Sequence, residues 1–248
     1  MCTLTALPLA GGGYRLAFNR DESRRRPAGL GPRRVQAGRR RAVMPIDPVS
    51  MGSWIGVNDA GLTAGLLNRY AGPPASGARP AAARASRGVI VPAVLGAGTL
   101  EEAAALAGEL DPSGFPPFRL ALCDGRACLE LISDGLTLRR GEALPLAEPV
   151  MLTSSGLGDH RVEGPRRELF RAMLLFPGAG LEEQDAFHRH CWPDRPELSV
   201  CMRRPEAATV SLTIVEVDRR AGEGRLIHHP GPPDEPAARS TVSLDLPA

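Results

Sequence analysis

The sequence of 248 residues has an ordinary composition, with 43% hydrophobic residues, 23% charged residues and a formal net charge of +2. These fractions are typical of a globular protein and exclude a collagen, a coiled coil or a largely disordered chain. All 30 basic residues are arginine, which excludes enzymes that need a Schiff-base lysine and nucleotide hydrolases that need a P-loop lysine.

The start of the sequence lacks the basic region of a signal peptide, and no run of about 20 apolar residues could cross a membrane. An odd number of cysteines also fits a chain that does not depend on disulfides. We therefore expect a cytoplasmic protein without a membrane span, in which five thiols are reduced: Cys2, Cys123, Cys128, Cys191 and Cys201.

Two β-hairpins are predicted in the first part of the chain. Residues 2–7 are rich in strand formers, a glycine triplet follows, and residues 14–18 return as the second strand. The next hairpin pairs residues 53–57 with residues 62–67 across an Asn-Asp-Ala-Gly turn. Asn, Asp and Gly tolerate the positive φ angles of tight turns, so the second hairpin is the clearer prediction.

Two segments are interpreted as long loops. Residues 20–41 hold nine arginines against Asp21 and Glu22, a net charge of nine minus two, or +7. Such a segment could contact phosphates, but no aromatic side chain lies among the arginines to stack on bases, so a solvated loop is favoured and nucleic acid is not an expected partner. Residues 71–86 consist of Ala, Gly, Pro, Ser and Arg without periodicity and predict a flexible loop.

Two helices are predicted downstream. The first begins at a capping box, Thr99-x-x-Glu102, and carries apolar residues on one face. The second is expected to have Pro165 in its first turn and to end before Pro177, with a buried stripe that consists of Leu169, Phe170, Met173 and Leu174.

Short strands are expected between and after these helices, at residues 118–123, 127–132, 136–139, 149–153, 209–217 and 225–229. Antiparallel hairpins that bracket helical segments, without β-α-β alternation, indicate a layered α+β fold. We expect a single domain over residues 1–229 and a Pro-rich C-terminal tail over residues 230–248.

Cys2 is the residue that points most directly to chemistry. If Met1 is removed, the Cys2 thiol lies beside its own α-amino group, whose pKa is about 7.7–8.0, so one residue supplies both nucleophile and base. The first hairpin can bring Asp21 back beside Cys2, where a carboxylate could hold the amine. The alternatives are a cysteine without a role and a polar, salt-bridged turn at residues 19–22.

Several motifs resemble the NRDE family, the transport and Golgi organisation type. They are Met-Cys-Thr at the start, Asn19-Arg20-Asp21-Glu22, Trp54-Ile55-Gly56-Val57-Asn58 followed by Gly61, Asn68-Arg69, and the strand at Thr209-Val210-Ser211-Leu212. The resemblance implies membership of the N-terminal nucleophile (Ntn) hydrolases, whose fold is a four-layer αββα sandwich.

The same N-terminal pattern is similar to the cholylglycine hydrolase and penicillin V acylase group, and that likeness implies roles for individual residues. Cys2 would attack an amide, Asp21 would contact its amine, and Asn68 would help to bind the oxyanion. An arginine that this group has three residues before the Asp is Phe18 here. Residues implied to support the site or contact substrate are Asn19, Arg20, Glu22, Arg69, Ser154 and Ser155 (in place of a second oxyanion asparagine), and either Arg203 or Arg204 as a late arginine.

The sequence therefore favours an amidohydrolase or acyl-transfer enzyme that acts through Cys2 on a small molecule of unknown structure. The alternative is a carrier without catalysis, for haem or an acyl-bearing lipid metabolite, and a scaffold that uses residues 20–41 comes third. His188-x-His190-Cys191 and Cys201 could be assembled into a metal site, but the paired CxxC spacing of structural zinc is missing. We expect no metal and no cofactor, with non-covalent haem left as an open ligand.

Overall fold

The computed structural model describes residues 2–70 and 85–247, which form two antiparallel sheets packed face to face between two helical layers. The six-stranded sheet consists, in spatial order, of β10 (Val150–Ser154), β1 (Cys2–Pro8), β2 (Tyr14–Ser23), β11 (Ala207–Asp218), β12 (Glu223–Pro230) and β13 (Ser240–Asp245). The seven-stranded sheet consists of β3 (Leu30–Ala37), β4 (Arg40–Ile46), β5 (Ile55–Asn58), β6 (Thr63–Asn68), β7 (Phe118–Cys123), β8 (Ala127–Ser133) and β9 (Leu138–Pro145).

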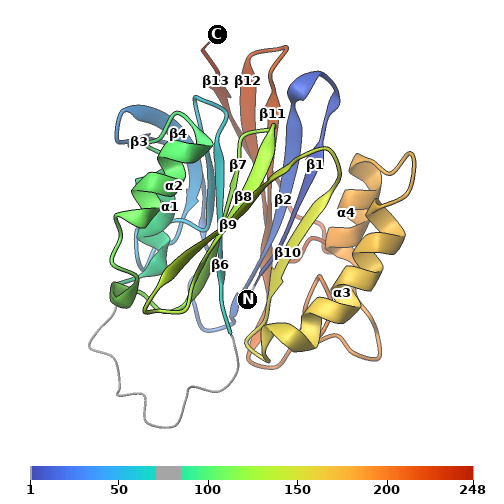
Figure 1. Ribbon diagram of the computed structural model, residues 1–248. Helices are drawn as coiled ribbons and strands as arrows, with labels where there is room; N and C mark the ends of the chain where they lie inside the picture. The colour runs from blue at the N-terminus through green and yellow to red at the C-terminus, as the bar shows by residue number, and fades with distance from the viewer. Residues whose placement is uncertain (1, 71–84, 248) are drawn as a thin grey trace.

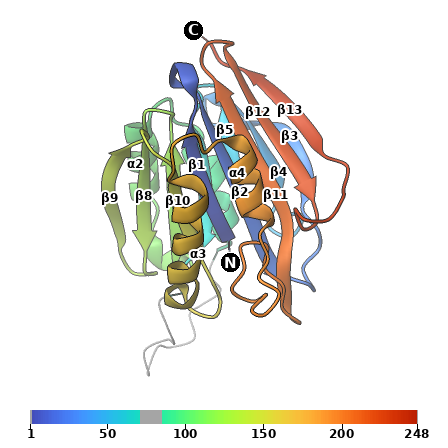
Figure 2. The same cartoon turned by 90° about the vertical axis from the view of Figure 1, so that its right-hand side faces the viewer.

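In the described residues, four α-helices cover the outer faces of the sheets: α1 (Ile90–Val94), α2 (Leu100–Gly108), α3 (Asp159–Leu174) and α4 (Leu181–Arg189). Figure 1 shows α1 and α2 against the seven-stranded sheet and α3 and α4 against the six-stranded sheet. Figure 2 shows α3 and α4 lying over the strands around β10, β1 and β2. The four-layer αββα sandwich expected from the motifs is confirmed.

Apolar side chains fill each of the three spaces between layers. The inter-sheet core includes Leu4, Phe18 and Val57, all fully buried. At Gly65 on β6, a Cβ atom would lie 2.6 Å from Leu4 Cδ1, so glycine permits the two sheets to approach closely there. Separate clusters pack under α1 and α2 and under α3 and α4.

Strand alternation decides which face of the six-stranded sheet carries each side chain. Along β1, Leu4 belongs to the inter-sheet core, whereas Thr5 bonds to His188 of α4 on the outer face. Since side chains alternate with a period of two, Cys2 shares the inner face with Leu4. Its partners across the sheet are Arg20 on β2 and Ser154 on β10. Cys2, the candidate nucleophile, therefore lies at the N-terminal end of β1, an interior strand, and its side chain faces the seven-stranded sheet.

Both predicted hairpins and the first helix start are confirmed. The hairpins are β1–β2 and β5–β6, and the turn glycine Gly61 has φ +68°. Thr99 Oγ1 accepts a hydrogen bond of 3.1 Å from the backbone N–H of Glu102 at the start of α2. Helix α3 begins at Asp159, six residues before Pro165, so the prediction that this proline lies in the first turn was wrong.

Two segments expected to be irregular form edge strands instead. The interpretation of residues 20–41 as a loop was wrong, because β2 continues to Ser23 and residues 30–46 form the β3–β4 hairpin. The prediction of a tail over residues 230–248 was wrong for Ser240–Asp245, which pair with β12 as β13. The loop predicted at residues 71–86 lies, up to residue 84, outside the described residues.

The expectation that all five thiols are reduced was wrong for one pair. Cys123 and Cys128 face each other across the β7–β8 hairpin and are joined by a disulfide. Cys2, Cys191 and Cys201 are free thiols. Disulfides persist mainly in oxidising compartments, so this bond bears on the cytoplasmic location, which stays a prediction. Among the described residues, no helix combines the length and apolar character needed to cross a membrane.

Candidate active site

A cavity of about 450 Å³ lies where the ends of several strands from both sheets meet. The six-stranded sheet contributes Cys2 from the start of β1 and Arg20 from the end of β2. The seven-stranded sheet and its connections contribute Asp47 after β4, Asn68 at the end of β6, and Arg87. This volume is in the range of sites for small molecules.

Cys2 is held from both sides within the cavity wall. It pairs with Ser154 and Arg20 and is only 6% exposed. Burial raises the pKa of its thiol, while the backbone N–H of Asp21 and the positive charge of Arg20 lower that pKa. Because burial is the largest of these influences, the thiol needs a base before it can act as a nucleophile.

Ser154 is a hydroxyl group placed beside that thiol. It is fully buried, and its Oγ has no hydrogen-bond partner within the described part of the chain. Directly opposed residues in an antiparallel pair have Cβ atoms about 4.5–5.5 Å apart. A buried hydroxyl without a partner is costly, and Ser154 lies beside Cys2 without being one of the residues that line the cavity.

Asp21 also lines the cavity, but its carboxylate bonds on the helix-covered side of the sheet. Thr209 Oγ1 donates to Asp21 Oδ1 at 2.6 Å. Burial raises the pKa of this carboxyl group, and the charges of Arg166 and Arg204 lower it. Two influences on Asp21 therefore oppose each other: burial disfavours the charged carboxylate, and the two guanidinium groups favour it.

Arg166 of α3 is a residue that the sequence reasoning missed. It is 1% exposed and donates to Thr3 Oγ1 at 2.8 Å, Thr153 Oγ1 at 2.7 Å and the backbone oxygens of Leu198 and Ser199 at 2.9 and 2.6 Å. All four acceptors are neutral, and they fix a positive charge behind the strand that carries Cys2. No motif could have indicated this, since the acceptors come from three distant segments.

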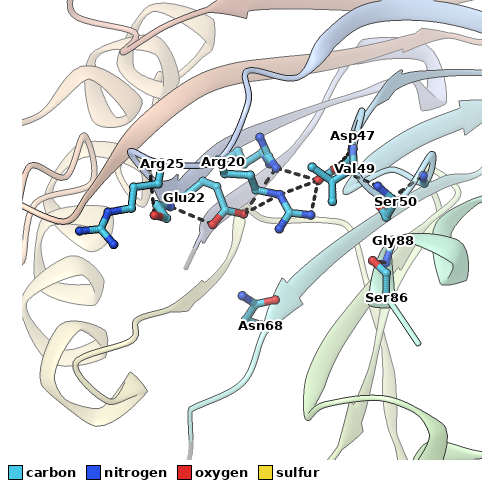
Figure 3. Close-up of polar contacts among 12 residues, drawn as sticks. Arg20, Glu22, Arg25, Asp47, Val49, Ser50, Asn68, Ser86 and Gly88 are labelled. Atoms are coloured by element: carbon cyan, nitrogen blue, oxygen red, sulfur yellow. Dashed lines mark hydrogen bonds and ion pairs between the residues drawn. The ribbon is translucent and has the colours of Figure 1, made fainter. Parts of the chain in front are cut away.

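Asp47 joins two arginines at the cavity (Figure 3). Arg20 Nη2 lies 3.0 Å from Asp47 Oδ2, and Arg26 Nη2 lies 2.8 Å from the same oxygen. The backbone N–H groups of Val49 and Ser50 donate to the other oxygen at 2.9 and 3.2 Å. These bonds hold the pKa of Asp47 below its usual value, although burial acts in the opposite direction.

Arg20 also contacts two further groups. Its guanidinium stacks 4.3 Å from the centre of the Trp54 ring, and its Nη2 lies 3.4 Å from Glu22 Oε2. Glu22 in turn lies 3.6 Å from Arg26 Nε. Arg20 and Glu22 of the expected set thus face the cavity as a paired network, anchored by Asp47, which the sequence reasoning did not select.

Asn68 lines the cavity apart from that network (Figure 3). Its Nδ2 donates to the hydroxyl of Tyr70 at 3.0 Å, which leaves the second amide hydrogen without a partner in the described residues. Arg69 bonds through its backbone N–H to the oxygen of Pro117 at 3.1 Å and is not part of the cavity lining.

The remaining candidates lie away from the cavity lining. Asn19 is fully buried and donates to the backbone oxygens of His188 and Val200 on the outer face of the sheet. Arg203 forms ion pairs with Asp234 and Glu235 on the surface. Two other candidates are placed outside the lining as well: Ser155, whose backbone N–H donates to Asp159, and Arg204, which pairs with Glu206.

The histidines and cysteines considered for a metal do not gather at one place. His188 is buried between Thr5 and Asn19, and Cys201 Sγ donates to Asp234 Oδ1 at 3.1 Å. In residues 2–70 and 85–247, no three His, Cys, Asp or Glu side chains lie in a metal-binding arrangement.

Solved structures of amide hydrolases share this fold. A Caenorhabditis elegans N-acylethanolamine-hydrolyzing acid amidase ortholog is 14% identical, with a TM-score of 0.57 and all of both chains covered. A mutant conjugated bile acid hydrolase from Clostridium perfringens is 14% identical (TM-score 0.54; 98% of this chain and 92% of that chain). Penicillin V acylase from Agrobacterium tumefaciens is 13% identical (TM-score 0.52; 99% and 86%). At these identities the likeness shows the fold alone.

No curated protein sequence matches the chain. The family described as Transport and Golgi organisation 2 matches residues 1–143, more than half of the chain, and this part includes Cys2, the tetrapeptide at 19–22 and Asn68. The chain belongs to the Transport and Golgi organisation 2 family.

Proposed function

We propose that the protein hydrolyses a C–N amide bond of a small molecule, or transfers its acyl group, through the thiol of Cys2. The observation that carries the proposal is the position of this thiol. The thiol lies at the N-terminal end of the interior strand β1 and lines a cavity with the volume of a small-molecule site. Ser154 is its neighbour on β10, and Asn68 lines the same cavity. The solved amide hydrolases with this fold support the reaction class.

The α-amino group of Cys2, exposed by removal of Met1, supplies the base. It takes the thiol proton, and Cys2 Sγ forms a bond to the amide carbon while the carbonyl π electrons move to oxygen. Collapse of this tetrahedral species breaks the C–N bond, and the ammonium returns its proton to the departing amine. Water then attacks the thioester, which releases the acid and restores the thiol.

Two donors are available for the oxyanion that forms in the first step. Asn68 has a free amide hydrogen among the described residues, and the Ser154 hydroxyl stands opposite Cys2. Loss of one such donor typically raises the barrier by about 2.7–4 kcal/mol. Asp21 stabilises the ammonium form of the Cys2 amine, and Thr209 orients that carboxylate. We also propose that the protein works in the cytoplasm.

The test compares Cys2→Ala, Cys2→Ser and a control, Cys191→Ser, on a panel of small amides and thioesters. We expect Cys2→Ala to abolish turnover and Cys191→Ser to leave it unchanged, because Cys191 does not line the cavity. An intact-mass spectrum after brief exposure to a limiting thiol electrophile should show loss of Met1 and preferential labelling at Cys2. Unchanged turnover in Cys2→Ala, or turnover with Met1 retained, would contradict the mechanism. Retained Met1 without turnover of any amide or thioester would favour a carrier.

A further inference from the structure

The charges that line the cavity do not all have partners. Six arginine and carboxylate side chains are involved: Arg20, Arg26, Arg87, Asp21, Glu22 and Asp47. Arg20 and Arg26 are matched by Glu22 and Asp47, through contacts of 2.8 to 3.6 Å. The Asp21 carboxylate faces the charges of Arg166 and Arg204 behind the sheet. Within the described part of the chain, Arg87 has no acidic partner.

Arg87 lies in the short 3-10 helix Arg87–Val89 that precedes α1, and it lines the same cavity as Cys2. Its Nη1 donates to the backbone oxygen of Pro117 at 2.8 Å, and no carboxylate lies within 4.0 Å of its guanidinium among the described residues. A guanidinium has five N–H donors, so most of them remain available to a ligand. Figure 3 shows its sequence neighbours Ser86 and Gly88 beside Ser50 at the cavity.

The surroundings of Arg87 oppose the positive charge of its guanidinium. Burial lowers the pKa of the Arg87 guanidinium, while Tyr70, Cys2 and Glu22 act in the opposite sense. Arg87 is half-buried, so its guanidinium loses part of its hydration, and a bound anion would offset that loss. The hydrogen bond from Arg87 Nη1 to the backbone oxygen of Pro117 fixes the orientation of the planar guanidinium group before a ligand binds.

We propose that Arg87 binds a carboxylate group of the substrate, so that the cavity takes amides that carry one negative charge. This inference rests on the proposed function, because it places the amide carbonyl at Cys2 and the carboxylate at Arg87. A carboxylate matches the fork of a guanidinium through two parallel hydrogen bonds. A doubly charged phosphate fits less well, since Glu22 and Asp47 line the same cavity and only one arginine is unmatched.

The test uses pairs of maleimides whose tails end either in a carboxylate or in the isosteric primary amide, with tails of several lengths. The rate of Cys2 labelling is followed by peptide mapping, so that adducts at Cys191 and Cys201 are not counted. The ratio of the acid rate to the amide rate cancels any difference in thiol reactivity between variants. We expect the acid to react about tenfold faster at the tail length that spans the cavity, equivalent to one charge-assisted hydrogen bond.

Arg87→Gln should bring this ratio close to one, and Arg87→Lys should restore part of it. Arg140→Gln is the matched control, because Arg140 is an exposed arginine on β9 and does not line the cavity. A ratio near one in the wild type at every tail length, or an unchanged ratio in Arg87→Gln, would overturn the inference. So would the absence of Cys2 labelling by either maleimide, since thiol and guanidinium must face one accessible cavity.

The labelling ratio separates this inference from the proposed function. If amides are not turned over but the ratio is high and depends on Arg87, hydrolysis is wrong and the carboxylate subsite stands. If amides are turned over but the ratio is near one, hydrolysis stands and the subsite is wrong. Cooperative thermal unfolding of each variant confirms that a changed ratio is not the result of misfolding.

Discussion

Asp47→Asn is the substitution that most directly tests the electrostatic organisation of the cavity. Asp47 holds Arg20, whose side chain is 6% exposed, and Arg26, whose side chain is 32% exposed. Removal of one partner from a buried ion pair typically costs about 3–5 kcal/mol, whereas a pair with a third of one side chain exposed contributes up to about 1 kcal/mol. Arg20 keeps Glu22 at 3.4 Å, which offsets part of the loss. We expect a loss of about 3 kcal/mol in the free energy of unfolding.

The loss should depend on pH with a defined sign. The pKa of Asp47 is lowered in the folded protein, so its contribution is fully present above the unfolded pKa of about 3.9 and is lost as the pH falls through the lower folded value. Urea unfolding at pH 7 and at several pH values below about 4 measures the difference between wild type and Asp47→Asn. That difference should shrink steadily in the acid range.

Two results would refute this reasoning. A difference below about 1 kcal/mol at pH 7 would mean that the ion pairs contribute no more than exposed ones. A large difference that stays constant down to acid pH would mean that loss of the carboxylate charge is not the cause. Asp245→Asn, on the exposed edge strand β13, is the matched control and should change stability by less than about 0.5 kcal/mol.

Two further predictions concern the outer face of the six-stranded sheet. Arg166→Met should lower the free energy of unfolding by about 3 kcal/mol in urea, because it removes four hydrogen bonds of a buried guanidinium, including those to the backbone oxygens of Leu198 and Ser199. The hydroxyls of Thr3 and Thr153 keep each other as partners at 3.0 Å, and a loss under about 1 kcal/mol would contradict the prediction. Burial lowers the pKa of His188 to about 3, so the wild type should lose stability as the pH falls below about 6.5, by up to about 1.4 kcal/mol per pH unit. Thermal unfolding between pH 7 and pH 4 should show a flatter slope for His188→Gln, and equal slopes would rule out this histidine as the source.

The elements that sequence reasoning predicted are those with strong local signals. The hairpins β1–β2 and β5–β6 have Gly, Asn and Asp in their turns, which tolerate the positive φ angles of tight turns, and both predicted hairpins are confirmed. The β3 and β13 edge strands were missed because an edge strand buries little, and its arginines, prolines and serines read as loop. Arginine on an exposed edge is one way in which a sheet avoids pairing with other chains.

The residues of the candidate site also differ in whether a local sequence signal indicates them. Cys2, Arg20 and Asn68 lie in sequence motifs near hairpin ends, and all three line one cavity. Arg87 and Arg166 carry no local signal, because their position depends on how distant elements pack. The pairing of β11 with β2 has a register shift between Thr209 and Ser211. Because of this shift, Thr209 lies opposite Asp21 and Ser211 lies opposite Arg20, and residue propensities could not have predicted it.

The two walls of the cavity are held in place in different ways. Cys2 is fixed by hydrogen-bonded neighbours on both sides of an interior strand, so it cannot shift without disrupting the sheet. The second wall, with Asn68 and Arg87, is built from a strand end and a connection of the other sheet. A substitution on the second wall can therefore change which molecule the cavity accepts while the sulfur of Cys2 keeps its position.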